Sequence, residues 1–258
     1  MSSIKGLVKQ GINRMLSPLG LEIKRIQSTQ AQDTKVEGFP GYLAEANKRG
    51  MDVNDWIEQE LKWEKALPIL EQTVFPYLRD DSVVCELGAG TGRHARHIAP
   101  RLRGGELHLV DHSPWTVAFL RNYFQSNPRV SVHLNDGCSL PFRDNSWADL
   151  IFSNGTFIEL KLGLFYLYSR EFWRVLKPGG YCVFDYIDAT TPEGWRHLES
   201  FSAKYWNCFT YHTPEVVDKV FTSAGFEIVA RHHIGKSTYL VVRKPVPDSM
   251  ESRQWSQR

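Results

Sequence analysis

The stretch VVCELGAGTGRHARHIA, at residues 83–99, constrains the fold of this chain more than any other. An apolar run ends next to an acid, three glycines alternate with small residues, and a segment of helical character follows. A glycine turn between a strand and a helix lets a ligand approach the backbone, because glycine has no side chain. The stretch therefore predicts a site for a nucleotide-like ligand.

Two common nucleotide-binding motifs are excluded at this turn. A Rossmann dehydrogenase needs G-x-G-x-x-G, and a P-loop needs G-x-x-x-x-G-K followed by Ser or Thr. Arg93 breaks both patterns. Glu86 would repel a diphosphate and attract an ammonium group. A nucleoside-like ligand with an amine and no phosphate fits this turn, and S-adenosylmethionine has this chemistry.

The remainder of the chain alternates strand and helix patterns. Expected strands are 83–87, 107–111, 130–134, 148–154, 181–186, 226–233 and 238–243, with helical segments between most of them. This alternation predicts an α/β fold with a mostly parallel sheet and helices on both faces. The short Gly-Lys-Ser turn at 235–237 predicts an antiparallel hairpin at one edge.

Two further acids follow successive strands. Asp111 ends the second strand. Its separation from the glycine turn along the sequence is the one at which an acid accepts hydrogen bonds from ribose hydroxyls. Asp136 follows the third strand, where it could accept from an adenine amino group. Each acid could instead cap the next helix. Three acids after successive strands are hard to assign to capping alone.

These motifs carry a family resemblance over roughly residues 63–244. ELGAGTGRHARHIA resembles the first motif of class I S-adenosylmethionine-dependent methyltransferases. NDGCSLPFRDNSWADLIFSNGTFIEL and REFWRVLKPGGYCVFDY resemble later motifs of the subgroup that includes the ubiquinone and menaquinone methyltransferases. The resemblance implies a Rossmann-like sheet of seven strands whose last strand is antiparallel.

The resemblance also implies roles for individual residues. The methionine half of the cofactor would be held by Glu86, Gly88, Gly90 and Gly92, and the ribose by Asp111. Asp136 and Gly137 would lie at the adenine, and Asn154 near the amino-acid end of the cofactor. His112 departs from the family pattern, which often has an aliphatic residue against the adenine at this position.

The chain is expected to have three parts. Residues 1–41 contain a basic amphipathic helix followed by a polar linker, residues 42–245 form the methyltransferase domain with a helical start, and residues 246–258 form a disordered tail. The first helix could lie on a membrane surface, or pack on its own domain or on a second copy of the chain.

Composition narrows the partners and the compartment. Lys and Arg total 31 against 29 Asp and Glu, which gives no electrostatic case for nucleic acid. No apolar stretch could span a bilayer and no signal-peptide pattern opens the chain, so we expect a cytoplasmic protein, or one peripheral at the inner membrane face. No metal site is expected, because metal-dependent catechol methyltransferases place an acid where this chain has Asn154.

The chemistry expected is an in-line displacement at the sulfonium methyl, in which positioning supplies much of the acceleration. A hydroxyl acceptor also needs a base. His212, just before a helix, is the first candidate, although it could equally be a surface histidine. Tyr211 could position the acceptor, and His197 is a weaker candidate.

The acceptor is the least constrained part. Base-methylating DNA enzymes have an Asn/Asp-Pro-Pro-aromatic signature after the fourth strand, whereas residues 153–156 read SNGT. Aromatic residues between the fifth and sixth strands suit a ring-bearing acceptor or pack as a lid. The leading hypothesis is O-methylation of a small molecule or saccharide. The alternatives are methylation of a quinone-type isoprenoid ring, and a non-catalytic protein that binds the cofactor.

Overall fold

The structure, a computed structural model, describes residues 38–205 and 207–247. The helices are α2 (Gly38–Lys48), α3 (Val53–Glu60), α4 (Ala66–Thr73), α5 (Ala95–Ile98), α6 (Pro114–Tyr123), α7 (Leu162–Val175), α8 (Pro192–Tyr205) and α9 (Pro214–Ser223), with short 3-10 helices η2 (Phe75–Tyr77) and η3 (Ala99–Arg101). The strands are β1 (Val83–Leu87), β2 (Glu106–Asp111), β3 (Val130–Leu134), β4 (Ala148–Ser153), β5 (Leu176–Asp188), β6 (Tyr211–His212), β7 (Glu227–Ile234) and β8 (Ser237–Arg243).

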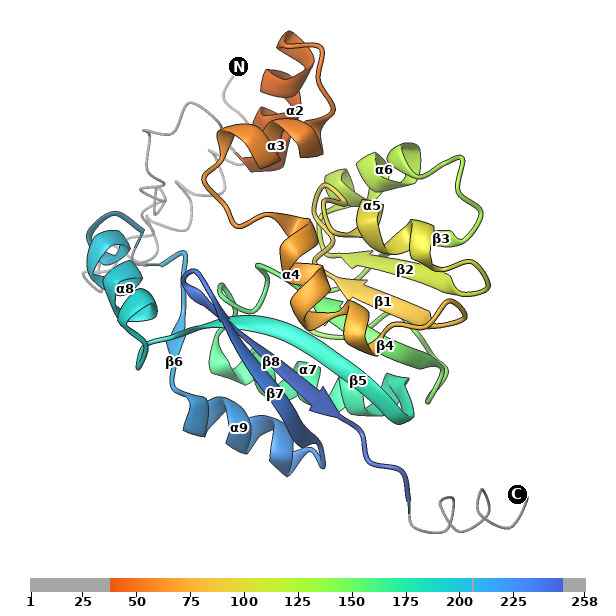
Figure 1. Ribbon diagram of the computed structural model, residues 1–258, viewed down its shortest axis with the longest axis vertical. Helices are drawn as coiled ribbons and strands as arrows, with labels where there is room; N and C mark the ends of the chain where they lie inside the picture. Colours follow the sequence, from red (N-terminus) through yellow and green to blue (C-terminus); the bar gives the residue numbers. More distant parts are fainter. Residues whose placement is uncertain (1–37, 206, 248–258) are drawn as a thin grey trace, which may run out of the picture. The chain divides into compact units, whose positions relative to one another are not determined.

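The strands form one sheet in the order β3-β2-β1-β4-β5-β8-β7, with β6 paired to the far end of β5. All pairs are parallel except those of β8, which runs antiparallel to both β5 and β7 (Figure 1). The expected mostly parallel sheet with an antiparallel last strand is therefore confirmed. Because β1 to β5 are parallel, their carboxyl ends meet at one edge, where the ligand sites of such folds lie.

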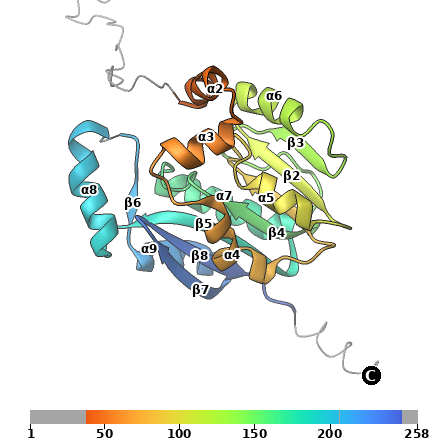
Figure 2. The same ribbon diagram turned by 45° about the horizontal axis from the view of Figure 1, so that its top comes forward.

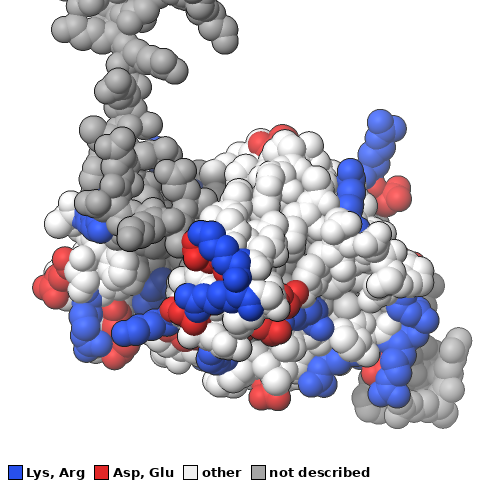
Figure 3. All heavy atoms as spheres, turned by 90° about the horizontal axis from the view of Figure 1, so that it is seen from above, with Lys and Arg blue, Asp and Glu red and all other residues white. Residues whose placement is uncertain are grey.

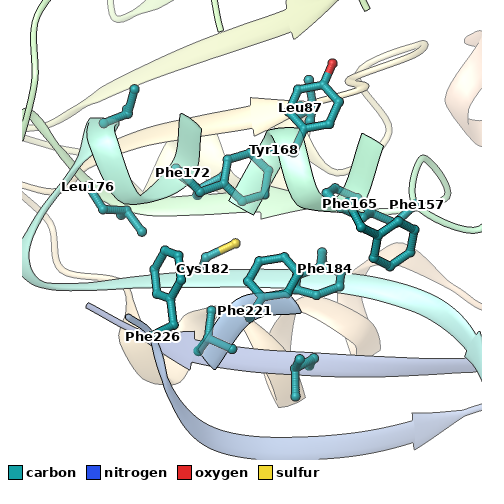
Figure 4. Close-up of a cluster of buried hydrophobic side chains, with 14 of the residues drawn as sticks. Leu87, Phe157, Phe165, Tyr168, Phe172, Leu176, Cys182, Phe184, Phe221 and Phe226 are labelled. Atoms are coloured by element: carbon teal, nitrogen blue, oxygen red, sulfur yellow. The ribbon is translucent and has the colours of Figure 1, made fainter. Parts of the chain in front are cut away.

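Helices cover both faces of the sheet (Figures 1 and 2). Aromatic side chains of α7 and α9 pack on one face, together with Phe157 and Phe184 (Figure 4). In α7 these side chains recur at helical spacing, so one stripe of the helix is buried. The other face packs against α4, α5 and α6 through residues such as Ile69, Ile98 and Leu120. Both faces of the sheet are therefore covered by helices, as is usual for parallel sheets.

Two helices, α3 and α6, begin with a side-chain cap. Asp52 caps α3 and accepts hydrogen bonds from the backbone N–H groups of Asn54 and Asp55. Ser113 caps α6 by accepting from the Thr116 N–H, and Pro114 occupies the first helical position. These caps fix the helices next to the carboxyl edge of the sheet.

Some sequence expectations differ from the structure or lie outside it. Helix α2 begins at Gly38, inside the stretch expected to be linker, and β6 was not expected at all. The basic amphipathic segment and residues 248–258 lie outside the described residues, so the membrane and self-association hypotheses and the expected domain limits stay predictions. Within the described residues, no helix has the length and apolar character needed to cross a membrane.

Candidate active site

The glycine turn after β1 has a backbone that only glycine adopts easily. Gly88, Gly90 and Gly92 all have positive φ, at 74°, 55° and 76°. A Cβ added at Gly88 would collide with the Thr156 side chain, and one at Gly90 would lie 2.9 Å from the ring of Phe39. The turn at the carboxyl edge of the sheet is therefore closely packed, and it leaves no space for side chains at Gly88 and Gly90.

Glu86 is a buried acid with an unused hydrogen-bonding atom. Its side chain is 2% exposed, and its Oε2 has no partner among the described residues. Burial raises the pKa of Glu86 to about 8, Arg93 opposes the shift through its charge, and Asp111 adds to it. A buried polar atom without a partner costs free energy. This oxygen and the adjoining glycines fit a ligand that brings an ammonium group against the backbone.

Arg93 does not form an ion pair with Glu86. Its guanidinium Nη1 donates to Glu58 Oε1 and to the backbone oxygen of Glu64, both at 2.9 Å, and it also lies over the ring of Trp63. The side chains of Arg93 and Glu58 are 11% and 14% exposed. Arg93, which departs from the dehydrogenase and P-loop motifs, therefore links the glycine turn to α3 and to the segment that follows it.

Helix α3 is fixed to the same turn by a buried amide. Asn54 donates to the Thr91 backbone oxygen at 2.9 Å and accepts from Thr91 Oγ1 at 2.6 Å. On the same helix, Asp55 accepts from Arg96 at 2.7 Å. These contacts make α3 part of the wall of the site rather than a separate appendage.

The acid at the end of β2 lies beside the turn, as expected. Asp111 is 6% exposed and accepts from the backbone N–H of Gly90 at 3.2 Å and of Ser113 at 2.9 Å. His112, next along the chain, has an exposed side chain. Its Cβ lies 3.9 Å from a Cβ built on Gly137, so the two residues that the resemblance associates with adenine are neighbours.

Asp136 is largely committed to its own loop. Its carboxylate accepts from the backbone N–H groups of Cys138 and Ser139 at 2.9 and 2.7 Å and from Ser139 Oγ at 2.9 Å. These hydrogen bonds lower the pKa of Asp136 to about 2. The side chain is exposed, so it shapes the turn that follows β3 and still borders the position of Gly137.

A row of polar side chains crosses the sheet on the face packed by α4 and α5. Glu86 pairs with Phe152, which pairs with Val183, so Asn154 and Asp185 lie two residues further along on the same face. Asp185 is 1% exposed and accepts from Gly155 N at 2.7 Å, from Ser237 Oγ at 2.9 Å and from Asn154 Nδ2 at 3.4 Å.

Asp185 is the main residue that the sequence reasoning missed. Within the described residues, neither Asp185 nor Asp188 belongs to a group of three or more candidate metal ligands, and the expectation of no metal site stays a prediction. A useful signal was present, because Asp185 is an acid inside an otherwise apolar strand pattern, and such an acid is rarely buried without a purpose.

The structure brings two of the three candidate catalytic residues together. His197 Nδ1 and the Tyr211 hydroxyl are 3.0 Å apart. Burial lowers the pKa of His197 to about 4, with Lys236 lowering it further through its charge and Glu64 opposing. His197 is therefore neutral near neutral pH and can accept a proton.

His212 lies on the opposite side of β6 from Tyr211, because neighbouring residues in a strand point to opposite faces. Its ring packs edge-on against Phe165 of α7, at 4.7 Å between centroids, and its buried Nε2 has no hydrogen-bond partner among the described residues. Burial lowers the pKa of His212. His212 therefore faces the core under α7 and not the row of polar residues.

The described surface shows mixed charge near the site. In the view of Figure 3, Lys and Arg side chains alternate with Asp and Glu, and the described residues on that face form no extended basic patch. Among the described residues, several charged side chains are paired, including Arg49 with Glu60 and Arg96 with Asp55. The expectation that nucleic acid is not a partner stays a prediction.

Comparison with known proteins gives a family match over part of the chain. Residues 84–180 match a family model described as a methyltransferase domain. The comparison with curated protein sequences found no match. The matched range contains the glycine turn, Asp111, Asp136 and Asn154.

Solved structures share the fold. An S-adenosylmethionine-dependent methyltransferase from Aquifex aeolicus is 18% identical, with a TM-score of 0.52 over 69% of this chain and 89% of its own. A Haloferax volcanii protein solved with the Trm112 methyltransferase activator is 19% identical, with a TM-score of 0.60 over 80% and 97%. The [4+2]-cyclase SpnF is 17% identical, with a TM-score of 0.56 over 93% and 97%.

At these identities the structural likeness concerns the fold, and the family match carries the activity. The buried acid and bare glycine turn fit the cofactor of that family. The ubiquinone-like subgroup suggested by the later motifs stays a prediction. The match to a methyltransferase domain at residues 84–180 indicates an enzyme whose cofactor is S-adenosylmethionine.

Proposed function

We propose that this enzyme transfers the methyl group of S-adenosylmethionine to a hydroxyl oxygen of a small molecule or saccharide. The proposal is carried by one observation: a neutral histidine and a tyrosine hydroxyl 3.0 Å apart, at the end of the sheet beyond Asn154. A sulfonium methyl needs no acid to leave, so the remaining chemical task for a hydroxyl acceptor is removal of its proton.

For the cofactor, we assign the ammonium group to Glu86 and the backbone contacts of the methionine half to Gly88, Gly90 and Gly92. Support comes from the unpartnered Glu86 oxygen and the positive φ angles of the glycines. Asn154 borders this region, at the end of β4. When bound, S-adenosylmethionine supplies an activated methyl group, while these residues hold and orient it.

For the adenosine half, we assign the ribose hydroxyls to Asp111 and the adenine to the pocket between His112, Asp136 and Gly137. Asp111 is buried at the turn and accepts only two backbone hydrogen bonds, so its carboxylate retains capacity for hydroxyl donors. Asp136 already accepts three hydrogen bonds. We therefore assign it mainly to shaping the adenine pocket.

The proton path runs through Tyr211 to His197. An acceptor hydroxyl at this position would give its proton to the Tyr211 oxygen, and Tyr211 would pass its own proton to His197 Nδ1. Tyr211 shares a face with Ile187, which pairs with both Tyr211 and Ser237. This register sets the pair at the level of Ser237, on the face that also holds Asn154.

The acceptor class follows from the surroundings of this pair. The ring of His197 stacks on Phe201 at 4.2 Å between centroids and meets Phe209 edge-on at 4.9 Å. Apolar ring faces beside hydroxyl and imidazole groups suit a sugar or a small ring-bearing alcohol. Localisation at a membrane face and contacts through the first helix are not needed for this assignment.

The test is methyl transfer from radiolabelled S-adenosylmethionine to separated acceptor fractions: saccharides, small alcohols and phenols, quinones, RNA, and protein. We expect label in saccharide or small-molecule fractions, as methyl ethers. Label confined to RNA, protein or quinones would refute the acceptor assignment. Absence of transfer to every fraction, with normal cofactor binding, would favour a non-catalytic protein of this fold.

Variants assign the base. His197→Gln should lower kcat by about 100-fold or more, as loss of a general base does. Tyr211→Phe should give a similar loss, because both belong to one path. His212→Gln is the matched control and should lose much less. If His212→Gln lost activity and His197→Gln kept it, the role would return to His212.

A further inference from the structure

Three carboxyl groups are buried on the same face of the sheet, those of Asp111, Glu86 and Asp185, and the last two lie one on each side of Asn154. Glu86 on β1 is 2% exposed and Asp185 on β5 is 1% exposed. Strand β4, which ends just before Asn154, lies between β1 and β5. Burying a carboxyl group without a cation is costly, so the two that flank Asn154 call for an explanation.

The carboxylate of Asp185 accepts hydrogen bonds from uncharged donors. The Gly155 N–H, the Ser237 hydroxyl and the Asn154 amide contact its two oxygens, which is the pattern a charged carboxylate needs. In the part of the chain that the structure describes, no Lys or Arg nitrogen forms a salt bridge with Asp185. Burial raises its pKa, while the charge of Lys236 and these hydrogen bonds oppose the rise.

The cofactor has a feature that explains a second acid. S-Adenosylmethionine carries a positive sulfur, whereas its product S-adenosylhomocysteine has a neutral sulfur and an identical ammonium group. An acid facing the ammonium therefore attracts both molecules equally. An acid near the methyl-transfer region attracts only the molecule that still carries its methyl.

We propose that Asp185 is a specificity-determining residue that makes the site prefer the sulfonium cofactor over its neutral product. It does so by placing a negative charge beneath Asn154 and by holding Asn154 and the Gly155 N–H in position. The inference rests on the proposed placement of the methionine half at Glu86. Its benefit is release of the product, which would otherwise compete with fresh cofactor.

Removing the positive charge of Lys236 should have the opposite effect to removing the negative charge of Asp185. It lies on the β7–β8 turn, half-buried, and forms no ion pair within the described residues. Its positive charge acts on Asp185 and so reduces the negative potential there. Replacing Lys236 by Met should therefore increase the preference for the sulfonium, whereas Asp185→Asn should decrease it.

The experiment is calorimetric titration of the full chain with S-adenosylmethionine and with S-adenosylhomocysteine. In Asp185→Asn we expect the ratio of the two dissociation constants to shift by about tenfold toward the product, the size of one charge acting across a partly polar site. Lys236→Met should shift it about two- to threefold the other way, because a half-exposed charge is screened. Glu86→Gln is the matched control and should weaken both ligands by the same factor.

If Asp185→Asn weakened both ligands equally, the residue would be structural only and the inference would be overturned. If Asp185→Asn did not fold, as judged by its melting transition, Lys236→Met alone would decide, and an unchanged ratio would overturn the inference. If the wild type bound neither ligand, the proposed function itself would fail. Binding with ratios that no variant changes would refute this inference alone.

Discussion

Lowering the pH should weaken the binding of S-adenosylmethionine through Glu86. Burial raises the pKa of this carboxyl from 4.5 to about 8 in the free protein, so it is protonated near neutral pH. An ammonium group favours the ionised form and lowers the pKa again. Binding therefore expels a proton, and the association constant rises with pH until the pKa of the free protein is reached.

The size of the effect follows from linkage. Below the free pKa of about 8, and above the pKa in the complex, affinity should rise about tenfold per pH unit, or about 100-fold from pH 5.5 to 7.5. Close to one proton should leave per cofactor bound at about pH 6.5. Calorimetry in two buffers of different ionisation enthalpy measures that number directly.

Glu86→Gln separates this carboxyl from other titrating groups. The variant should bind more weakly at pH 7.5 and release no proton, because its amide cannot titrate. A proton count near zero in the wild type, or the same pH dependence in both proteins, would refute the reasoning. In the second case the titrating group would be a residue other than Glu86.

Three further changes test the packing of the site. Burial raises the pKa of Glu86 in the folded protein, so its contribution to the free energy of unfolding is full below pH 4.5 and is lost as the pH rises toward 8. In urea unfolding, the wild type should lose about 4 kcal/mol across that range, whereas Glu86→Gln should not. Gly88→Ala forces a left-handed φ of 74° and a collision with Thr156; it should lower the melting temperature and abolish cofactor binding, and adding Thr156→Ala should restore only part of the stability. Arg93→Met removes the Arg93 guanidinium from the largely buried Glu58, which keeps only the Ala66 N–H at 3.1 Å and the more distant Lys65 among the described residues, and should cost about 2 kcal/mol. The double variant with Glu58→Met should cost less than the sum of both single changes, and additive losses would contradict a coupled pair.

Much of the fold could be predicted because strands and turns have strong local signals. The limits of β1 and β3 match the expected ranges, since apolar runs there are bounded by turn residues. Strand β5 is longer than expected because Leu176 already pairs with Ala148 ahead of a bulge. Strand β6 has only two residues, a length at which no alternation can be recognised.

The site was partly predictable for a geometric reason. Acids at the ends of parallel strands meet at one edge, so Glu86 and Asp111 could be placed together from the strand pattern alone. Long-range pairs could not be placed. Asn54 bonds to Thr91, 37 positions away, and no local pattern encodes that contact.

The partner of the candidate base could not be predicted from the sequence either. His212 and Tyr211 are adjacent in the sequence, yet the strand turns them to opposite faces, and the partner of Tyr211 is His197 on α8. That outcome depends on β6 pairing with β5, which is decided by tertiary packing. A strand of this length carries no signal of its own, so the faces could not be assigned in advance.

The most direct test of the account is a crystal structure of the full chain with S-adenosylhomocysteine bound. We predict the ammonium group within hydrogen-bonding distance of Glu86 Oε2, the oxygen that lacks a partner here, and the ribose hydroxyls on Asp111. A ligand bound elsewhere, or bound at the turn with its ammonium directed away from Glu86, would contradict the claim that this buried acid selects the cofactor.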